Sequence, residues 1–247
     1  MRAMFKRHTN EVNNISFSPD GRSLVSGSDD HSVCLWNIRD GSSKELPVTD
    51  DADYFLSVVF SPDGRYIAAG GWGHSIWIWD SRTHKLAANW KGHSGPVWFV
   101  GFTPDGKGLM SGGDTKLKCW DARSLGIHEA ISGREAVVPG DSFPLARSFY
   151  GHTVRLCFYF VGCSLSRYSH LQENIYSIAF FPNNSEWIIT SAQDGSVRVW
   201  NIRTGVWQLV MRGHWGAVMD VDIGGTENFI ATASPDCNFT LWRYEVL

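Results

Sequence analysis

The chain has 247 residues, of which 43% are hydrophobic and 19% are charged, and its formal net charge at pH 7 is −3. This composition is typical of a globular protein that can bury a substantial core, and the acidic balance argues against direct nucleic-acid binding. No apolar run is long enough to span a bilayer, the first residues hold no apolar signal core, and five scattered cysteines form no disulfide framework, so we expect no membrane association and a location in the nucleus or cytoplasm.

Taken in chain order, five segments share one pattern: a strand end of small residues, a tight turn, and an alternating strand that ends in tryptophan. They are VSGSDDHSVCLWN with Trp36, AAGGWGHSIWIWD with Trp79, MSGGDTKLKCWD with Trp120, TSAQDGSVRVWN with Trp200 and TASPDCNFTLWR with Trp242. Alternation is typical of a half-buried strand and Asp-Gly of a two-residue turn, so each segment predicts a β-hairpin. The tryptophans stand 43, 41, 80 and 42 residues apart.

Each hairpin follows a further predicted strand with its own turn. These strands and turns are ISFSPDG from Ile15, VVFSPDG from Val58, GFTPDG from Gly101, AFFPNN from Ala179 and VDIGGT from Val221. Pro presets φ and Gly accepts positive φ, which makes Pro-Asp-Gly a turn. Each unit therefore supplies three or four short antiparallel strands. Residues 1–6 are expected to form an outer strand that pairs with the last unit if the units close into a ring.

This repeat resembles the WD40 family, whose unit of about 40–45 residues has a Gly-His start and a Trp-Asp end. The resemblance implies an all-β fold, a β-propeller of about five blades. It covers one domain, 1–247, with repeats at about 8–47, 50–90, 91–147, 149–210 and 212–247. Rings of this family usually have about seven blades, so a compact ring and a truncated arc of a seven-bladed propeller both stay open, with the truncated product favoured.

The most specific motif that carries this resemblance is a tetrad of His, Ser or Thr, Asp and Trp, whose polar groups can satisfy one another inside a blade. The tetrads are His8, Ser26, Asp30 and Trp36; His93, Ser111, Asp114 and Trp120; His152, Thr190, Asp194 and Trp200; and His214, Thr232, Asp236 and Trp242. The second unit departs from the motif, because Ala69 and Gly73 replace the hydroxyl and the carboxylate. Copies at fixed offsets are typical of structural networks, so we predict no catalytic residue, no metal ligand and no cofactor.

The long interval between Trp120 and Trp200 contains the segment 154–172, directly after Gly151-His152-Thr153. Excising these 19 residues restores the spacing from His to the first strand that is found at His8. Val codons begin with GT and the CAG codon of Gln ends with AG, so we interpret 154–172 as an aberrant insertion, a translated intron, with a genuine loop insertion as the alternative. Its Cys and His residues match no common zinc spacing.

In the WD40 family, residues at the start of each first strand lie near the mouth of the central channel. By their offset from the tetrad His and the following turn, the predicted protein-binding face consists of Asn13, Asn14, Leu56, Trp98, Phe99, Tyr176, Trp215, Met219 and Asp220. Aromatic and methionine side chains are typical anchors of protein interfaces. The alternative is that some of them point into the blade wall.

A second candidate surface resembles the Trp-Asp-x-Arg box by which some WD40 proteins dock on cullin-type ubiquitin ligases. The two boxes are Trp79, Asp80 and Arg82, and Trp120, Asp121 and Arg123. Because this box overlaps the general end of a blade, its specificity is low.

Within the family, ENIYSIAFFPNN, DGSVRVWNIRTG and FIATASPDCNFTLWRYEVL are most similar to the C-terminal propeller of fungal Tup-type, Groucho-like transcriptional corepressors. The helical segment through which such corepressors oligomerise has no counterpart here. We therefore expect a non-enzymatic scaffold that binds protein or peptide partners, with a corepressor-like role in a multiprotein complex. The alternatives are a substrate receptor of a ubiquitin ligase and a propeller enzyme, which would need paired acids in the channel.

Overall fold

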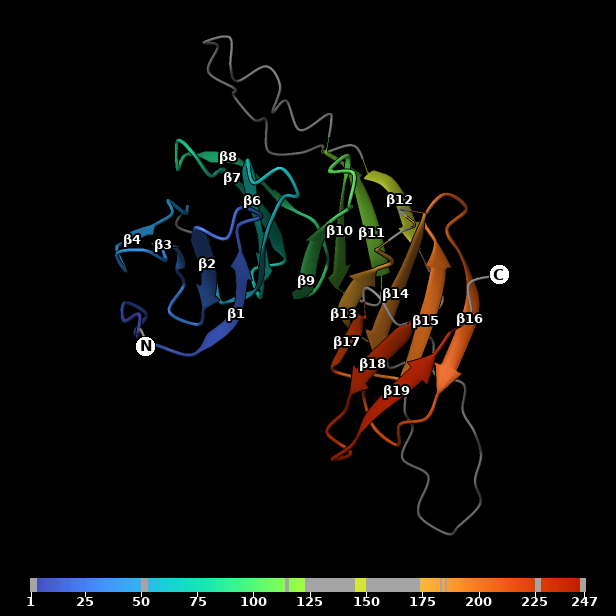
Figure 1. Ribbon diagram of the computed structural model, residues 1–247. Coiled ribbons are helices and arrows are strands. Elements are labelled where there is room, and N and C mark those ends of the chain that lie inside the picture. The colour runs from blue at the N-terminus through green and yellow to red at the C-terminus, as the bar shows by residue number, and fades with distance from the viewer. Residues whose placement is uncertain are drawn as a thin grey trace.

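The computed structural model describes residues 4–49, 53–113, 116–122, 174–182, 184, 186–224 and 228–244, together with the backbone of 145–149. The described residues contain no α-helix and form five antiparallel sheets, which confirms the all-β prediction (Figure 1). We number these sheets as blades 1 to 5 in chain order. The segment 154–172, with His152, lies outside the described residues, as do Asp114 and Arg123.

Blades 1 to 4 each contain four strands, and blade 5 contains three among its described residues. Blade 1 comprises β1 (Val12–Phe17), β2 (Ser23–Ser28), β3 (Val33–Asn37) and β4 (Ser43–Glu45); blade 2 comprises β5 (Phe55–Phe60), β6 (Tyr66–Gly71), β7 (Ser75–Asp80) and β8 (Leu86–Lys91). Blade 3 comprises β9 (Val97–Phe102), β10 (Gly108–Gly113), β11 (Lys116–Asp121) and β12 (Leu145–Phe149); blade 4 comprises β13 (Ile175–Phe180), β14 (Trp187–Ala192), β15 (Ser196–Asn201) and β16 (Val206–Arg212). Blade 5 comprises β17 (Asp220–Ile223), β18 (Phe229–Ala233) and β19 (Phe239–Arg243).

The Pro-Asp-Gly turns join the first two strands of blades 1 to 3. Gly21, Gly64 and Gly106 have φ of 67°, 71° and 68°, the left-handed conformation that glycine adopts without strain. In the first turn, the Ser18 hydroxyl donates to Asp20 Oδ1 at 2.6 Å, and the same oxygen accepts from the Arg22 amide at 3.0 Å. The turn is therefore closed by its own side chains, as the sequence predicts.

The first strand begins with a register shift at the same place in four blades. Along β1, β5, β9 and β13, one residue is skipped in the pairing with the second strand: Asn13, Leu56, Trp98 and Tyr176, respectively. A bulge of this kind bends the strand and re-aims the side chain of the unpaired residue. The bulge thus sets apart one side chain per blade at the start of the innermost strand.

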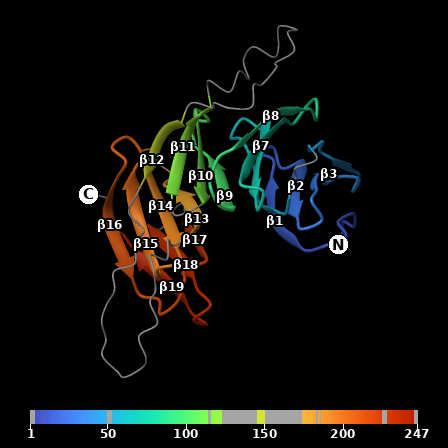
Figure 2. The ribbon, with the colours of Figure 1, turned by 180° about the vertical axis from the view of Figure 1, so that it is seen from behind.

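The blades pack side by side in chain order, with β1 against β5, β5 against β9, β9 against β13 and β13 against β17. Four apolar clusters fill the spaces between neighbouring blades, and the largest fully buried side chains include Trp79 and Trp200. Blades 1 and 5 lie at opposite ends of this row in both views (Figures 1 and 2). Their outer faces remain exposed, so the described blades form an open arc and not a compact ring.

The expected outer strand at the N-terminus is absent from the described residues 4–6, which have no strand conformation. Instead, the Phe5 ring packs on Trp36 with 5.6 Å between ring centroids, and Arg7 pairs with Glu45 at 3.0 Å. The predicted pairing with the last blade was conditional on ring closure, and the open arc does not meet this condition; residues 1–3 lie outside the described residues. Phe5 packs on apolar surface of blade 1, because blade 5 lies at the other end of the arc.

Candidate protein-binding site

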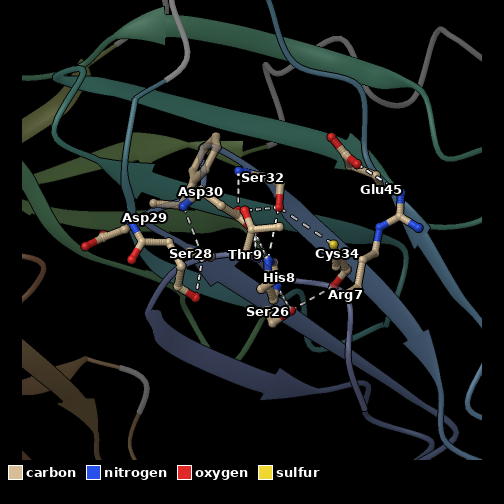
Figure 3. A network of polar contacts seen from close by, with 12 residues as sticks. Arg7, His8, Thr9, Ser26, Ser28, Asp29, Asp30, Ser32, Cys34 and Glu45 are labelled. Carbon is tan, nitrogen blue, oxygen red and sulfur yellow. Dashed lines mark hydrogen bonds and ion pairs between the residues drawn. The ribbon is translucent and has the colours of Figure 1, made fainter.

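The tetrad of blade 1 forms a continuous hydrogen-bonded network (Figure 3). His8 lies between Asp30 and Ser26, with Nδ1 at 2.9 Å from Asp30 Oδ2 and Nε2 at 2.6 Å from Ser26 Oγ. The indole of Trp36 donates to the same Ser26 oxygen at 2.8 Å. Each polar group is used within the blade, so the network joins the segment before the first strand to the second and third strands.

The same geometry recurs in blade 5, and parts of it recur among the described residues of blades 3 and 4. In blade 5, His214 lies 2.9 Å from both Asp236 Oδ2 and Thr232 Oγ1, and Trp242 donates to Thr232 at 3.0 Å. In blade 3, the Ser111 hydroxyl is 2.8 Å from both His93 Nε2 and Trp120 Nε1. In blade 4, Trp200 donates to Thr190 at 2.8 Å. This repetition gives these His and Asp side chains structural partners.

Blade 2 replaces the network with apolar packing. Trp79 is fully buried, and its indole donates to the backbone carbonyl of Pro47 at 2.7 Å. The Trp77 and Trp79 rings lie nearly parallel, at 10° and with 6.0 Å between centroids, and Phe55 meets both rings edge-on. The Trp79 indole N–H therefore donates to a backbone carbonyl in the connection between blades 1 and 2. The tryptophans of the other four blades donate to a Ser or Thr hydroxyl.

Blade 4 contains a buried ion pair that the sequence reasoning missed. Arg198 Nη1 lies 2.9 Å from Asp194 Oδ2, and both side chains are almost completely buried. Asp194 also accepts from the Ser196 amide at 2.9 Å. The signal in the sequence was Arg198 within the apolar alternation SVRVW, at the position where blade 1 has Cys34. A buried guanidinium needs a carboxylate partner, so Asp194 has a role beyond its tetrad.

The carboxyl of Asp30 is held in its charged form. Burial would raise its pKa, but hydrogen bonds from Ser32, the Thr9 amide and His8 outweigh that effect and lower the pKa from 3.8 to about 2. A group whose pKa falls on folding stabilises the native state above its unfolded pKa, and this contribution is lost as the pH falls toward the folded value. The relevant pH window therefore lies between about 4 and about 2.

We expect Asp30→Asn to flatten the acid limb of the stability profile. Between pH about 4 and about 2, the unfolding free energy of the wild type should fall more steeply than that of the variant, because only the wild type must protonate this carboxyl. Urea unfolding at a series of pH values measures this slope. Parallel curves through the window would show that Asp30 does not carry the pH dependence.

Three of the four residues set apart by the strand bulges, Leu56, Trp98 and Tyr176, line one cavity. The cavity has a volume of about 410 Å³ and is lined by residues of the first strands of blades 1 to 4 and the start of blade 5. Of the predicted face, its lining includes Asn14, Leu56, Trp98, Phe99, Tyr176, Met219 and Asp220. The structure thus brings together residues that are up to 206 positions apart in the chain.

Aromatic side chains dominate one side of this cavity. Trp98 and Tyr176 meet edge-on with 5.3 Å between centroids, and Trp72 meets Trp98 edge-on at 5.9 Å. Trp72, which is about half exposed, follows β6 in the turn where blade 1 has Asp29, and the sequence reasoning missed it. Its only signal was a tryptophan between two glycines in a turn. Trp72, Trp98 and Tyr176 together are called the aromatic group below.

The remaining residues of the predicted face have different surroundings. Asn13 donates to Asp29 and to the Phe55 carbonyl, and Asn14 accepts from the Val58 amide, so both connect blades. Phe99 is buried in the cluster between blades 3 and 4. Trp215 is 96% exposed in the connection before β17, outside the cavity lining. Exposed apolar surface around the mouth therefore comes from Trp72 and Met219, while Trp98 and Tyr176 are partly buried.

The box that ends β7 is arranged by its own turn. Trp79 is buried, and Asp80 Oδ1 accepts from the amides of Arg82 at 3.0 Å and Thr83 at 2.7 Å. Burial raises the pKa of Asp80, but these hydrogen bonds reverse the effect and leave it below its ordinary value. Arg82 is exposed, whereas the second box is incomplete in the described residues because it ends at Arg123. Within the first box, Arg82 is therefore the exposed side chain that a partner could reach.

The part of the chain that the structure describes contains no group of three or more His, Cys, Asp or Glu side chains placed to hold a metal ion. It also contains no helix with the length and apolar character that crossing a membrane requires.

Comparison with known proteins gives one family. The model of the WD40 family, described as WD domain, G-beta repeat, matches residues 2–37, 48–80, 84–121, 161–201 and 205–243. These matches cover well over half of the chain, and each includes a blade tryptophan.

Three curated relatives indicate the range of similar proteins. Periodic tryptophan protein 2 of Arabidopsis thaliana is 26% identical over 83% of this chain and 24% of its own length. Protein groucho of Drosophila melanogaster is 22% identical over 96% of this chain and 33% of its own length. Transcriptional repressor rco-1 of Neurospora crassa is 32% identical over 28% of this chain and 12% of its own length. The chain thus spans a third or less of each of these relatives.

Proposed function

Because the chain belongs to the WD40 repeat family, we propose that residues 1–247 act as a single non-enzymatic scaffold that binds a protein or peptide at the mouth of the arc. The observation that carries this proposal is the convergence of the bulge residues of blades 2 to 4, Leu56, Trp98 and Tyr176, on one cavity. Repeat arrays use such a surface, built from equivalent positions, to bind extended partners.

The chemistry of the cavity supports a protein partner. The aromatic group offers large, rigid rings beside the exposed Met219, the kinds of side chain that anchor interfaces. Among the described residues that line the cavity, Asp220 is the one with a charged side chain, and it accepts from the Ser177 hydroxyl at 2.7 Å. A single carboxylate without a second acid beside it favours a binding role over acid–base hydrolysis, which uses a carboxylate pair.

We further propose a corepressor-like role within a multiprotein complex in the nucleus or cytoplasm, without direct contact to nucleic acid. Two relatives, protein groucho and the transcriptional repressor rco-1, support this assignment, and groucho aligns with almost the whole chain. The net charge of −3 supports protein partners over a phosphate backbone.

Affinity capture with the double variant Trp98→Ala, Tyr176→Ala tests the site. We expect recovery of the partners to fall about tenfold or more, because aromatic anchors at the centre of an interface each contribute more than about 1 kcal/mol. The control is Trp207→Ala, since Trp207 is a half-exposed tryptophan that lies on β16 at the outer edge of blade 4, away from the cavity. Met219→Lys provides a second variant at the mouth whose side chain is exposed and not part of the core.

Unchanged capture by both mouth variants would refute the proposed site. Capture of a cullin adaptor that depends on Arg82, with the mouth variants still active, would instead support the ubiquitin-ligase alternative.

A further inference from the structure

The two end blades expose positions that the inner blades bury. In each blade, the side of the first strand that packs against the preceding blade is called the leading face. In blade 1 it consists of Val12, Ile15 and Phe17, which are 49%, 55% and 63% exposed. The equivalent residues of blade 2 are Phe55, Val58 and Phe60, and those of blade 3 are Val97, Val100 and Phe102, all at most 7% exposed. The leading face of blade 1 therefore lacks the neighbour that its equivalents have.

The opposite side of each blade, on the second and third strands, is called the trailing face. In blade 1 it consists of Val25, Val33 and Leu35, which pack against Phe55, Val58 and Phe60 of blade 2 in one cluster. In blade 4 the equivalent Ile189, Val197 and Val199 pack against blade 5 in the same way. The internal contacts of the arc are thus repeated packings of a trailing face on a leading face.

Blade 5 presents an exposed trailing face, against which no other described blade packs. The pairing of Ala231 with Leu241 repeats the pairing of Val25 with Leu35 in blade 1, which places Phe239 and Leu241 at the positions of Val33 and Leu35. Phe239 is 75% exposed and Leu241 is 59% exposed, whereas Val33 is fully buried. Exposed apolar surface of this kind is typical of an association site.

Polar groups follow the same repeat. Asn14 Oδ1 accepts from the Val58 amide of the next blade at 3.1 Å, and Ser57 Oγ accepts from the Val100 amide at 3.1 Å. Asp220 holds the equivalent position in blade 5. By the same repeat, the amide equivalent to those of Val58 and Val100 in blade 1 belongs to Ile15. A carboxylate acceptor on one open face and an amide on the other are therefore complementary.

We propose that two copies of this chain associate head to tail, with the trailing face of blade 5 of one copy on the leading face of blade 1 of the other. A second copy fits because its blade 1 offers the kind of face that already packs on a trailing face between each pair of neighbouring blades in the chain. The contact is heterologous, because it joins two different faces. Each pair therefore keeps one free leading face and one free trailing face, and further copies add until a ring or a filament forms.

Two variants that each block one face test this inference. Phe17→Asp blocks the leading face and Leu241→Asp blocks the trailing face. In light scattering after size exclusion, each variant alone should have the mass of one chain, 27.6 kDa. An equimolar mixture should form a pair of twice that mass and stop there, because the two intact faces meet in the pair and both of its outer faces are blocked. The wild type should grow beyond the pair as its concentration rises.

The control variant is Val206→Asp, an exposed apolar position on β16 that belongs to neither face, and it should associate like the wild type. Val12→Asp and Phe239→Asp provide a second pair of blocking variants, to be used if either member of the first pair melts below the wild type. A mixture of two folded blocking variants that stays at the single-chain mass overturns the proposal. A wild type that remains a single chain at every concentration overturns it as well.

Discussion

Asp194→Ala is expected to lower the free energy of unfolding by about 3–5 kcal/mol, since it leaves the Arg198 guanidinium buried without its carboxylate. Both side chains of this pair are about 95% buried, so water cannot replace the lost partner. Equilibrium unfolding in urea measures the loss. Because repeat arrays can unfold one unit at a time, hydrogen exchange should place the lost protection in β13 to β16.

The matched control is Glu45→Ala, which breaks the pair between Arg7 and Glu45. That pair has a similar distance of 3.0 Å, but its side chains are 40% and 50% exposed. Exposed ion pairs contribute about 0–1 kcal/mol, so this variant should be close to the wild type. Arg198→Met should cost less than Asp194→Ala, because the Asp194 carboxylate that it leaves buried still accepts from the Ser196 amide. Equal losses from Asp194→Ala and Glu45→Ala would contradict the role of burial.

Gly71→Ala should destabilise blade 2 by about 3 kcal/mol through overpacking against the backbone. A Cβ at Gly71 would lie 1.8 Å from the carbonyl oxygen of Tyr54, which itself accepts from the Trp72 amide at 2.9 Å. Because the obstacle is main chain held by a hydrogen bond, relief requires the start of β5 to move away from β6. Thermal unfolding followed by circular dichroism measures the loss.

Gly216→Ala is the matched control, because the nearest heavy atom to its added Cβ, Ser234 Oγ, lies at an ordinary 3.6 Å. We expect a change within about 0.5 kcal/mol there. The Gly71 variant should also weaken partner capture, because Trp72 belongs to the aromatic group and follows Gly71 directly. A stable Gly71→Ala protein with full capture would show that the tight contact at β5 relaxes without cost.

The candidate site was only partly visible in the sequence. The offset from the turns identified Trp98, Tyr176 and Met219, because the repeat places equivalent residues at equivalent points of the first strand. Trp72 was not predicted, because it lies in a different turn and contacts Trp98 only when blade 2 packs on blade 3. The same offset also gave Phe99, which lines the cavity but is buried in the core between blades 3 and 4, because successive side chains of a strand point to opposite faces.

By itself the sequence determined the elements of this protein: alternating apolar residues, Pro-Asp-Gly turns and recurrent tryptophans are local signals, and each specifies one antiparallel sheet. Tertiary structure alone decided how the sheets meet. It placed blades 1 and 5 apart with exposed faces, gave Trp79 the Pro47 carbonyl, and paired Arg198 with Asp194. These outcomes depend on the curvature summed over all blades and on which side chains become buried next to one another. No local sequence pattern encodes either of them.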